Sequence, residues 1–272
     1  MPRIVLPLSA YREIGAFCSK EQTRYYLNGV CLETAGVVVA TDGHMLAARR
    51  FAPDEFASVD AGAADWIIPL DSKIAKAKAK GLKDWPHWLV VDRPDPTSRA
   101  VTLYAVAGGD AGEALQIPRE KILSMAPAEL IDGTFPDWRR VTPRGGRDES
   151  RPVYQHLAEA VARWEQDPGS DEKALDRARE ALGSVADYSL ARPALSPVLL
   201  ARVCEAFPSI SAPLTLHPGP TDADPALVEI GGRGDVVVVL MPMRRVSDPA
   251  YSAPDWALPA PRPTAPALRA AE

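Results

Sequence analysis

The sequence predicts an α+β protein built from repeated strand–helix–strand–strand units, with the helices on one face of antiparallel sheets. Short runs rich in Val, Ile and Tyr alternate with short amphipathic segments, and the same order of elements occurs twice in roughly the first 140 residues. The chain has 272 residues, which suffices for two ordinary domains with cores of their own.

The first unit opens with a β-prone run at Arg3–Leu8. Ser9 is placed to cap a helix over Ala10–Ser19. Two strand regions follow, at Arg24–Glu33 and Gly36–Arg50.

The second unit repeats this order. A strand at Asp65–Pro69 precedes a helix that begins at Asp71 or Ser72 and runs to Lys80, with Gly81 as the residue that ends it. Two strands and a region that is part strand and part loop complete the unit: His87–Asp92, Ala100–Ala107 and Gly112–Arg140.

A Pro-, Gly- and Arg-rich segment at Thr142–Pro152 marks a domain boundary. Helices are expected at Pro152–Glu165 and Asp171–Leu182, and Ser196-Pro197 starts another that runs to Phe207. The expected strands are Asp187–Leu190, Leu214–His217, Ala226–Ile230 and Asp235–Met241. We therefore predict one domain over 1–143 and a second over 151–245.

Residues 246–272 are predicted to form a disordered tail, because proline is dense there and large apolar residues are scarce. The prolines concerned are Pro249, Pro254, Pro259, Pro261, Pro263 and Pro266.

The charge balance argues against a protein coated in positive charge, since the net charge is −5. A local basic patch for nucleic acid stays compatible with it. The three cysteines, Cys18, Cys31 and Cys204, form no CxxC pair, which favours a reducing, cytoplasmic setting over a disulfide framework or a zinc site. We expect no signal peptide and no membrane span.

Three strings occur in order along the chain: Arg24–Gly29 (RYYLNG) followed by Ala40–Ala47 (ATDGHMLA), then Leu130–Val141 (LIDGTFPDWRRV), and finally Met241–Arg244 (MPMR). Together they resemble the bacterial DNA polymerase III beta subunit, the sliding clamp. The resemblance covers about residues 1–143 and 187–245, and it implies the DNA-clamp fold.

The resemblance assigns residues 1–143 to the family's middle domain and residues 151–245 to a divergent version of its last domain, with a helical replacement at 151–186. The family's first domain has no counterpart here, and the chain continues past the MPMR string. These departures weaken the expectation of the family's closed ring of two chains.

In the family, the three strings form an apolar groove that receives a short linear motif from polymerases, the clamp loader and repair proteins. The corresponding residues here are Leu27, Thr41, Gly43, His44, Leu46, Pro136, Arg140, Val141, Val239, Met241, Pro242 and Met243. Flexible Met side chains suit a surface that serves several partners. Met45 stands where a basic residue is common, which implies a less polar rim. On periodicity alone, the same residues are better explained as ordinary core, with Asp42-Gly43 as a plain turn.

DNA contact without sequence specificity is expected from two sets of residues. Lys73, Lys76 and Lys80 form a stripe on the predicted helix, and Arg24, Tyr25 and Tyr26 match family positions near the rim of the ring's hole. The alternative for the three lysines is a solvated surface helix, and the alternative for the two tyrosines is a buried strand.

Asp42 and His44 are the nearest approach to a catalytic pair, but they lack an orienting partner and a recognisable motif. We therefore expect no enzyme activity, no cofactor and no metal. The interpretation is a clamp-like processivity or docking factor, as a trimeric ring or as a monomer. The alternative is a non-encircling interaction protein that competes for or recruits motif-bearing partners.

Overall fold

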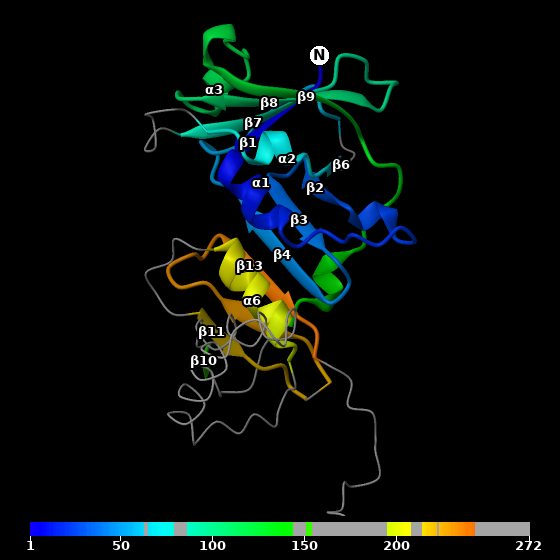
Figure 1. Ribbon diagram of the computed structural model, residues 1–272, viewed down its shortest axis with the longest axis vertical. Coiled ribbons are helices and arrows are strands. Elements are labelled where there is room, and N and C mark those ends of the chain that lie inside the picture. The colour runs from blue at the N-terminus through cyan, green and yellow to red at the C-terminus, as the bar shows by residue number, and fades with distance from the viewer. Residues whose placement is uncertain are drawn as a thin grey trace, which may run out of the picture.

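Two antiparallel sheets, stacked along the long axis of the molecule, form the frame of the fold (Figure 1). The computed structural model describes residues 1–62, 65–78, 86–143, 151–153, 195–207, 214–221 and 223–242. The α+β class is confirmed, and so is the repeated order of strand, helix, strand and strand.

The smaller sheet has five strands in the order β5-β1-β7-β8-β9. Their bounds are β1 Arg3–Pro7, β5 Ala57–Val59, β7 His87–Asp92, β8 Ala100–Ala107 and β9 Ile122–Glu129. Strand β1 lies between β5 and β7 and pairs with both in antiparallel register. The predicted bounds of β7 and β8 are confirmed, whereas β5 was not predicted.

The larger sheet has eight strands in the order β10-β11-β12-β13-β4-β3-β2-β6. Their bounds are β2 Gly29–Glu33, β3 Val37–Thr41, β4 Met45–Arg50, β6 Trp66–Pro69, β10 Arg151–Val153, β11 Leu214–His217, β12 Ala226–Glu229 and β13 Val236–Leu240. The pairing of β13 with β4 places Val239 opposite Leu46 and Leu240 opposite Met45. One sheet therefore joins strands from both predicted domains.

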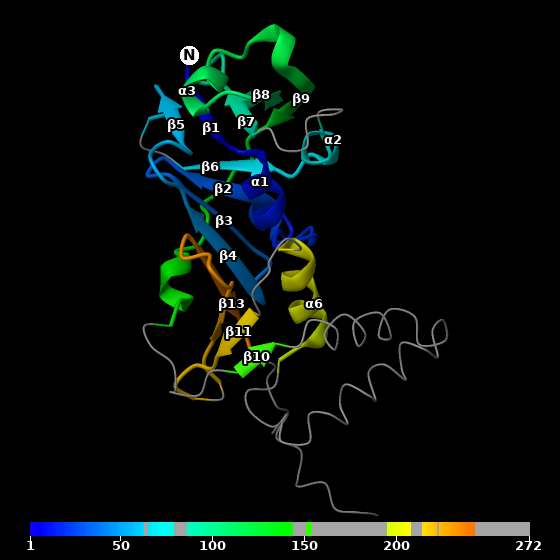
Figure 2. The same cartoon turned by 90° about the vertical axis from the view of Figure 1, so that its left-hand side faces the viewer.

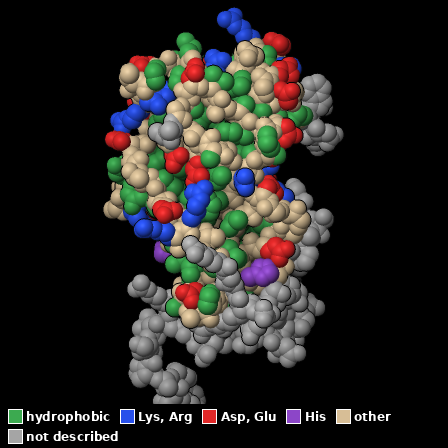
Figure 3. Space-filling model, turned by 180° about the vertical axis from the view of Figure 1, so that it is seen from behind, with side chains coloured by type: hydrophobic (Ala, Val, Ile, Leu, Met, Phe, Trp, Pro, Cys, Tyr) green, Lys and Arg blue, Asp and Glu red, His purple; other side chains and the backbone are tan. Residues whose placement is uncertain are grey.

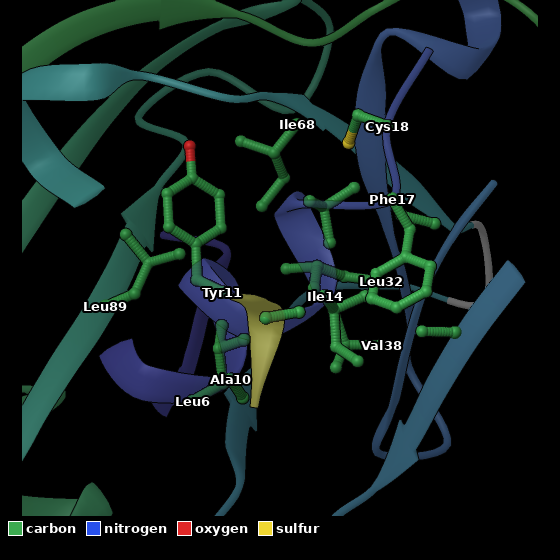
Figure 4. Close-up of a cluster of buried hydrophobic side chains, with 14 of the residues drawn as sticks. Leu6, Ala10, Tyr11, Ile14, Phe17, Cys18, Leu32, Val38, Ile68 and Leu89 are labelled. Atoms are coloured by element: carbon green, nitrogen blue, oxygen red, sulfur yellow. The ribbon is translucent and has the colours of Figure 1, made fainter. Parts of the chain in front are cut away.

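Side-chain alternation gives the larger sheet two apolar faces. Val38, Met45 and Val238 pack into the main core, while the neighbouring Val39 and Leu46 pack into a second cluster on the other face. The main core also takes in helix α1, Leu8–Gly15, and Figure 4 shows its side chains facing those of the strands.

Four α-helices are described: α1, α2 (Ser72–Ala75), α3 (Ala111–Ala114) and α6 (Pro197–Ala206). Asp71 caps α2 by accepting a hydrogen bond from the amide N of Ile74 at 2.8 Å. Helix α6 has proline at its first turn, as predicted. Short 3-10 helices occupy η1 Tyr25–Leu27, η2 Arg119–Lys121 and η3 Trp138–Val141.

Several predicted helix and strand bounds are wrong. Helix α1 begins at Leu8 with Pro7 in the cap position, so Ser9 lies inside the helix and caps nothing. The first half of the predicted strand at 24–33 is the turn η1. The predicted helix at 72–80 ends at Ala75, because the Arg12 side chain donates to the carbonyls of Ala75 and Ala77.

Other predictions fall largely outside the described residues. Arg151–Val153 is a strand and not the beginning of a helix. The remainder of the predicted helices at 152–182, the strand at 187–190, the tail at 246–272, and Lys80, Gly81 and Met243 lie outside the described ranges.

Candidate functional site

A hollow of about 210 Å³ lies where the three strings meet. Its lining combines the turn η1, the β3–β4 turn, the segment 136–141 and the end of β13. The residues that line it are Arg24, Tyr26, Leu27, Thr41, Gly43, Met45, Leu46, Pro136, Asp137, Trp138, Val141, Val239 and Met241.

The β3–β4 turn is held by the side chains of Thr41 and Asp42. The hydroxyl of Thr41 donates to the carbonyl of Met45 at 2.7 Å and accepts from the amide of Gly43 at 3.0 Å. One carboxylate oxygen of Asp42 accepts the amides of His44 and Met45, both at 2.9 Å. Gly43 adopts a φ of +90°, a conformation that favours glycine.

The floor of the hollow is apolar and its side chains are buried. Leu46 and Val239 face each other across the β4–β13 pairing and are 3% and 1% exposed. The amide of Met241 donates to the carbonyl of His44 at 2.8 Å, which holds the end of β13 against the turn. Val141 is 39% exposed, so an apolar side chain of the wall is open to solvent.

The structure brings together eight of the twelve residues predicted for the groove: Leu27, Thr41, Gly43, Leu46, Pro136, Val141, Val239 and Met241. His44 is exposed, and its backbone carbonyl holds the rim. Arg140 pairs with Asp137 at 3.3 Å. Pro242 is half-buried beside Met241, and Met243 lies outside the described residues.

Comparisons of sequence and of structure with known proteins find the same kind of protein. No family model matches the sequence. The chain is 31% identical over 151 residues to the beta sliding clamp of Pseudomonas aeruginosa, covering 53% of this chain and 34% of that protein. It is 27% identical to the beta sliding clamp of Salmonella typhimurium, covering 53% of this chain and 33% of that one. The structure of a Bartonella birtlesii sliding clamp bound to griselimycin matches with a TM-score of 0.55 at 19% identity, covering 89% of this chain and 66% of that one.

This chain is similar in sequence to bacterial beta sliding clamps over about half of its length. Its sequence alignment spans about a third of the length of the curated clamps that it matches. The structural match supports the clamp fold for most of the chain.

Five residues of the clamp-like hollow were not predicted to line it: Arg24, Tyr26, Met45, Asp137 and Trp138. Arg24 and Tyr26 were assigned to DNA contact, but here the Arg24 guanidinium lies over Gly43 and is paired with Glu21 at 2.8 Å. Asp137 and Trp138 belong to the same string as Pro136, and this closeness in sequence could have indicated that they line the hollow.

Met45 does not alter the rim of the groove as the sequence comparison implied. The side chain is 1% exposed and belongs to the main core, so it contacts the hollow from inside.

The residues expected to contact DNA lie on separate segments, near α2 and in η1. Lys73 and Lys76 are exposed, but the helix ends before Lys76, so the predicted stripe on one helix is not present. Lys80 lies outside the described residues. Tyr25 is 52% exposed and contacts Tyr26 edge to face, with ring centroids 6.0 Å apart.

The Asp42 carboxylate is engaged by backbone amides and by an arginine. Asp42 bonds to the backbone of His44, and its second oxygen pairs with Arg202 of α6 at 2.5 Å. Within the described ranges, no three His, Cys, Asp or Glu side chains gather as metal ligands. None of the helices that the structure describes is long and apolar enough to cross a membrane.

Proposed function

We propose that this chain is a clamp-like docking factor that holds a short apolar motif of a replication or repair protein in the groove. The observation that carries the proposal is the open apolar hollow built from the three strings. At about 210 Å³ it is smaller than the roughly 300–1,000 Å³ of sites for drug-sized molecules, so it suits one or two side chains of a peptide.

The groove also has the adaptability that a motif-binding surface needs. Met241 lines one side, and Arg24, whose guanidinium lies over Gly43, supplies positive charge at the margin opposite in sign to that of Asp137. An apolar anchor with polar neighbours would seat in such a site by burial of its side chains and be oriented by the charges.

DNA contact without sequence specificity is the second part of the proposal, through exposed Lys73 and Lys76 and through Tyr25. A non-encircling docking protein is the competing function. It is favoured by the face of the larger sheet that α1 and α6 cover, which we call the helix side. Arg12 and Arg202 on that side bind protein carbonyls and Asp42, so their positive charge is engaged within the protein instead of being free for DNA phosphates. Mass measured by light scattering distinguishes a trimeric ring from a monomer.

The direct test is peptide titration with a Val141→Asp variant. The peptide carries a clamp-binding motif of a bacterial replicative polymerase and is followed by fluorescence anisotropy. Burying an unpaired carboxylate costs at least about 2 kcal/mol, so the affinity should fall at least about thirtyfold. Val141 is 39% exposed, so the substitution should leave the fold intact.

Met125→Asp is the matched control, because Met125 is a 52% exposed apolar residue on β9, outside the hollow. It should bind the peptide as the wild type does. Equal affinities for wild type and Val141→Asp would remove the groove assignment.

A further inference from the structure

The carboxylate of Glu33 joins one wall of the groove to the larger sheet. Glu33, the last residue of β2, has a side chain that is only 12% exposed. Its Oε1 accepts the indole Nε1–H of Trp138 at 2.8 Å and the Nη1–H of Arg139 at 2.8 Å. Its Oε2 accepts the Nη2–H of Arg139 at 2.7 Å. The carboxylate is therefore forked by one guanidinium and shared with the neighbouring indole.

The three groups form a closed unit. The guanidinium carbon of Arg139 stands 4.3 Å from the centroid of the Trp138 ring, within cation–π range. Charge-assisted, bidentate bonds of this kind fix direction as well as distance. The unit therefore fixes the orientation of the turn η3 and not merely its position.

The turn carries the groove's outer wall. Trp138 and Val141 line the hollow, and Pro136 precedes them in the same segment, whereas Glu33 and Arg139 do not line it. Figure 2 shows this turn on the side of the strands opposite to α1 and α6, with the strands between them. Glu33 thus acts on the hollow only through the residues that it holds.

The electrostatics support a strong hold. The hydrogen bonds from Arg139 keep the pKa of Glu33 below its ordinary value, although partial burial opposes the shift. Burial, with repulsion from Glu33, raises the pKa of Asp65, and Arg139 opposes that rise. Arg139 therefore offsets two neighbouring carboxylates, and its removal would leave Glu33 facing Asp65.

We propose that Glu33 is a positioning residue of the groove, holding Trp138 and Arg139 so that the wall at 136–141 keeps its peptide-binding shape. This inference rests on the proposed function. The plainer reading is an ion pair that stabilises the fold and has no effect on binding, and the experiment separates the two.

The experiment compares Glu33→Ala and Glu33→Gln with the wild type in two assays. One is peptide affinity by anisotropy. The other is the NMR signal of the Trp138 indole N–H, assigned by its loss in Trp138→Phe. Glu33→Ala should lose about tenfold in affinity and shift the indole signal. Glu33→Gln keeps an oxygen for the indole but loses the charged, bidentate pair with Arg139. Its peptide affinity and its indole signal should therefore lie between those of the wild type and those of Glu33→Ala.

Asp92→Ala is the matched control. Asp92 is also paired with an arginine, Arg3, at 2.7 Å, and its side chain is 13% exposed, but it lies on β7 away from the hollow. It should lower the melting temperature as Glu33→Ala does and leave peptide affinity unchanged. Arg139→Lys keeps the positive charge but cannot form the bidentate pair with Glu33. It should retain more peptide affinity than Arg139→Ala.

Two outcomes overturn the inference. Wild-type affinity in Glu33→Ala would show that the wall's position is unimportant, and an unchanged indole signal would show that Glu33 does not hold the wall. A wild type that binds no peptide would overturn the proposed function instead. The indole signal would still report whether Glu33 fixes the wall.

Discussion

The two faces of the eight-stranded sheet carry hollows of opposite character. The groove holds about 210 Å³ and has Leu46 and Val239 on its floor. The hollow beside α1 and α6 holds about 970 Å³, and its lining includes Arg12, Glu13 and Glu205. The first is suited to bury a few apolar side chains, while the second is wider and mixes charges of both signs with apolar side chains.

Two of the basic side chains that line the larger hollow, Arg12 and Arg202, are engaged within the protein. The Arg12 guanidinium binds the carbonyls of Ala75 and Ala77, and Arg202 binds Asp42 and the carbonyl of Ala16. Figure 3 shows the opposite face, away from α1 and α6, where basic and acidic side chains are interspersed. The comparison teaches that charge here joins elements together, whereas the open apolar surface is left for a partner.

The β3–β4 turn connects the two faces. Gly43 lines the groove, while Asp42 reaches Arg202 on the helix side and accepts two amides of its own turn. A change at Asp42 should therefore disturb both hollows at once.

Asp42→Ala tests this link and should have the largest effect. It removes the acceptor of two amides and leaves Arg202 without its carboxylate. The Asp42 side chain is only 13% exposed. We expect a loss of about 2–4 kcal/mol in the free energy of unfolding, measured in urea, together with weaker peptide binding.

Asp95→Ala is the control for turn capping alone, because Asp95 accepts the amide and hydroxyl of Thr97 in an exposed turn. It should change the unfolding free energy little. Similar losses in both variants would mean that Asp42 stabilises only its turn and does not join the faces.

Gly43→Ala should have a smaller effect that is confined to the groove. A Cβ at Gly43 would lie 2.4 Å from Nη1 of Arg24, so this side chain must move, and the φ of +90° adds backbone strain of about 1–3 kcal/mol. Gly62→Ala is the control, since Gly62 has a φ of +74° and nothing within 4 Å.

Both glycine variants should lose similar stability in thermal melts, but only Gly43→Ala should lose peptide affinity, by a few-fold. An equal effect of both on peptide binding would show that Arg24 and Gly43 play no special part at the groove.

The sequence predicted those strands whose ends are set by neighbouring residues, and it failed where an end depends on a distant side chain. Strands β7 and β8 have the predicted bounds because alternation and flanking turn residues define both ends. The end of α2 could not be predicted, because it depends on Arg12, some 63 residues earlier in the chain. Ser9 failed as a cap because the helix starts one residue before it, after Pro7.

The groove shows the same division. Its apolar residues followed from the three strings, and eight of the twelve line the hollow. The bond between Glu33 and Trp138 joins residues 105 apart, and no spacing rule predicts such a pair. The position of Arg24 over Gly43 likewise depends on how the chain folds back, which placed a residue assigned to DNA inside the groove.

The smallest expected effect concerns DNA. Lys73 and Lys76 are exposed, and the Lys73 ammonium donates to the carbonyl of Met125 at 3.3 Å. Each phosphate neutralised contributes about 0.9 to the slope of log affinity against log salt. The double variant Lys73→Glu/Lys76→Glu should therefore flatten the slope by up to about two units and leave peptide affinity unchanged. Binding of duplex DNA at several salt concentrations measures this.

An unchanged slope would place DNA contact elsewhere, with exposed Tyr25 as the next residue to substitute. A wild type that binds no DNA at low salt would establish the sharper contrast, in which the groove side binds a partner and the helix side binds no nucleic acid.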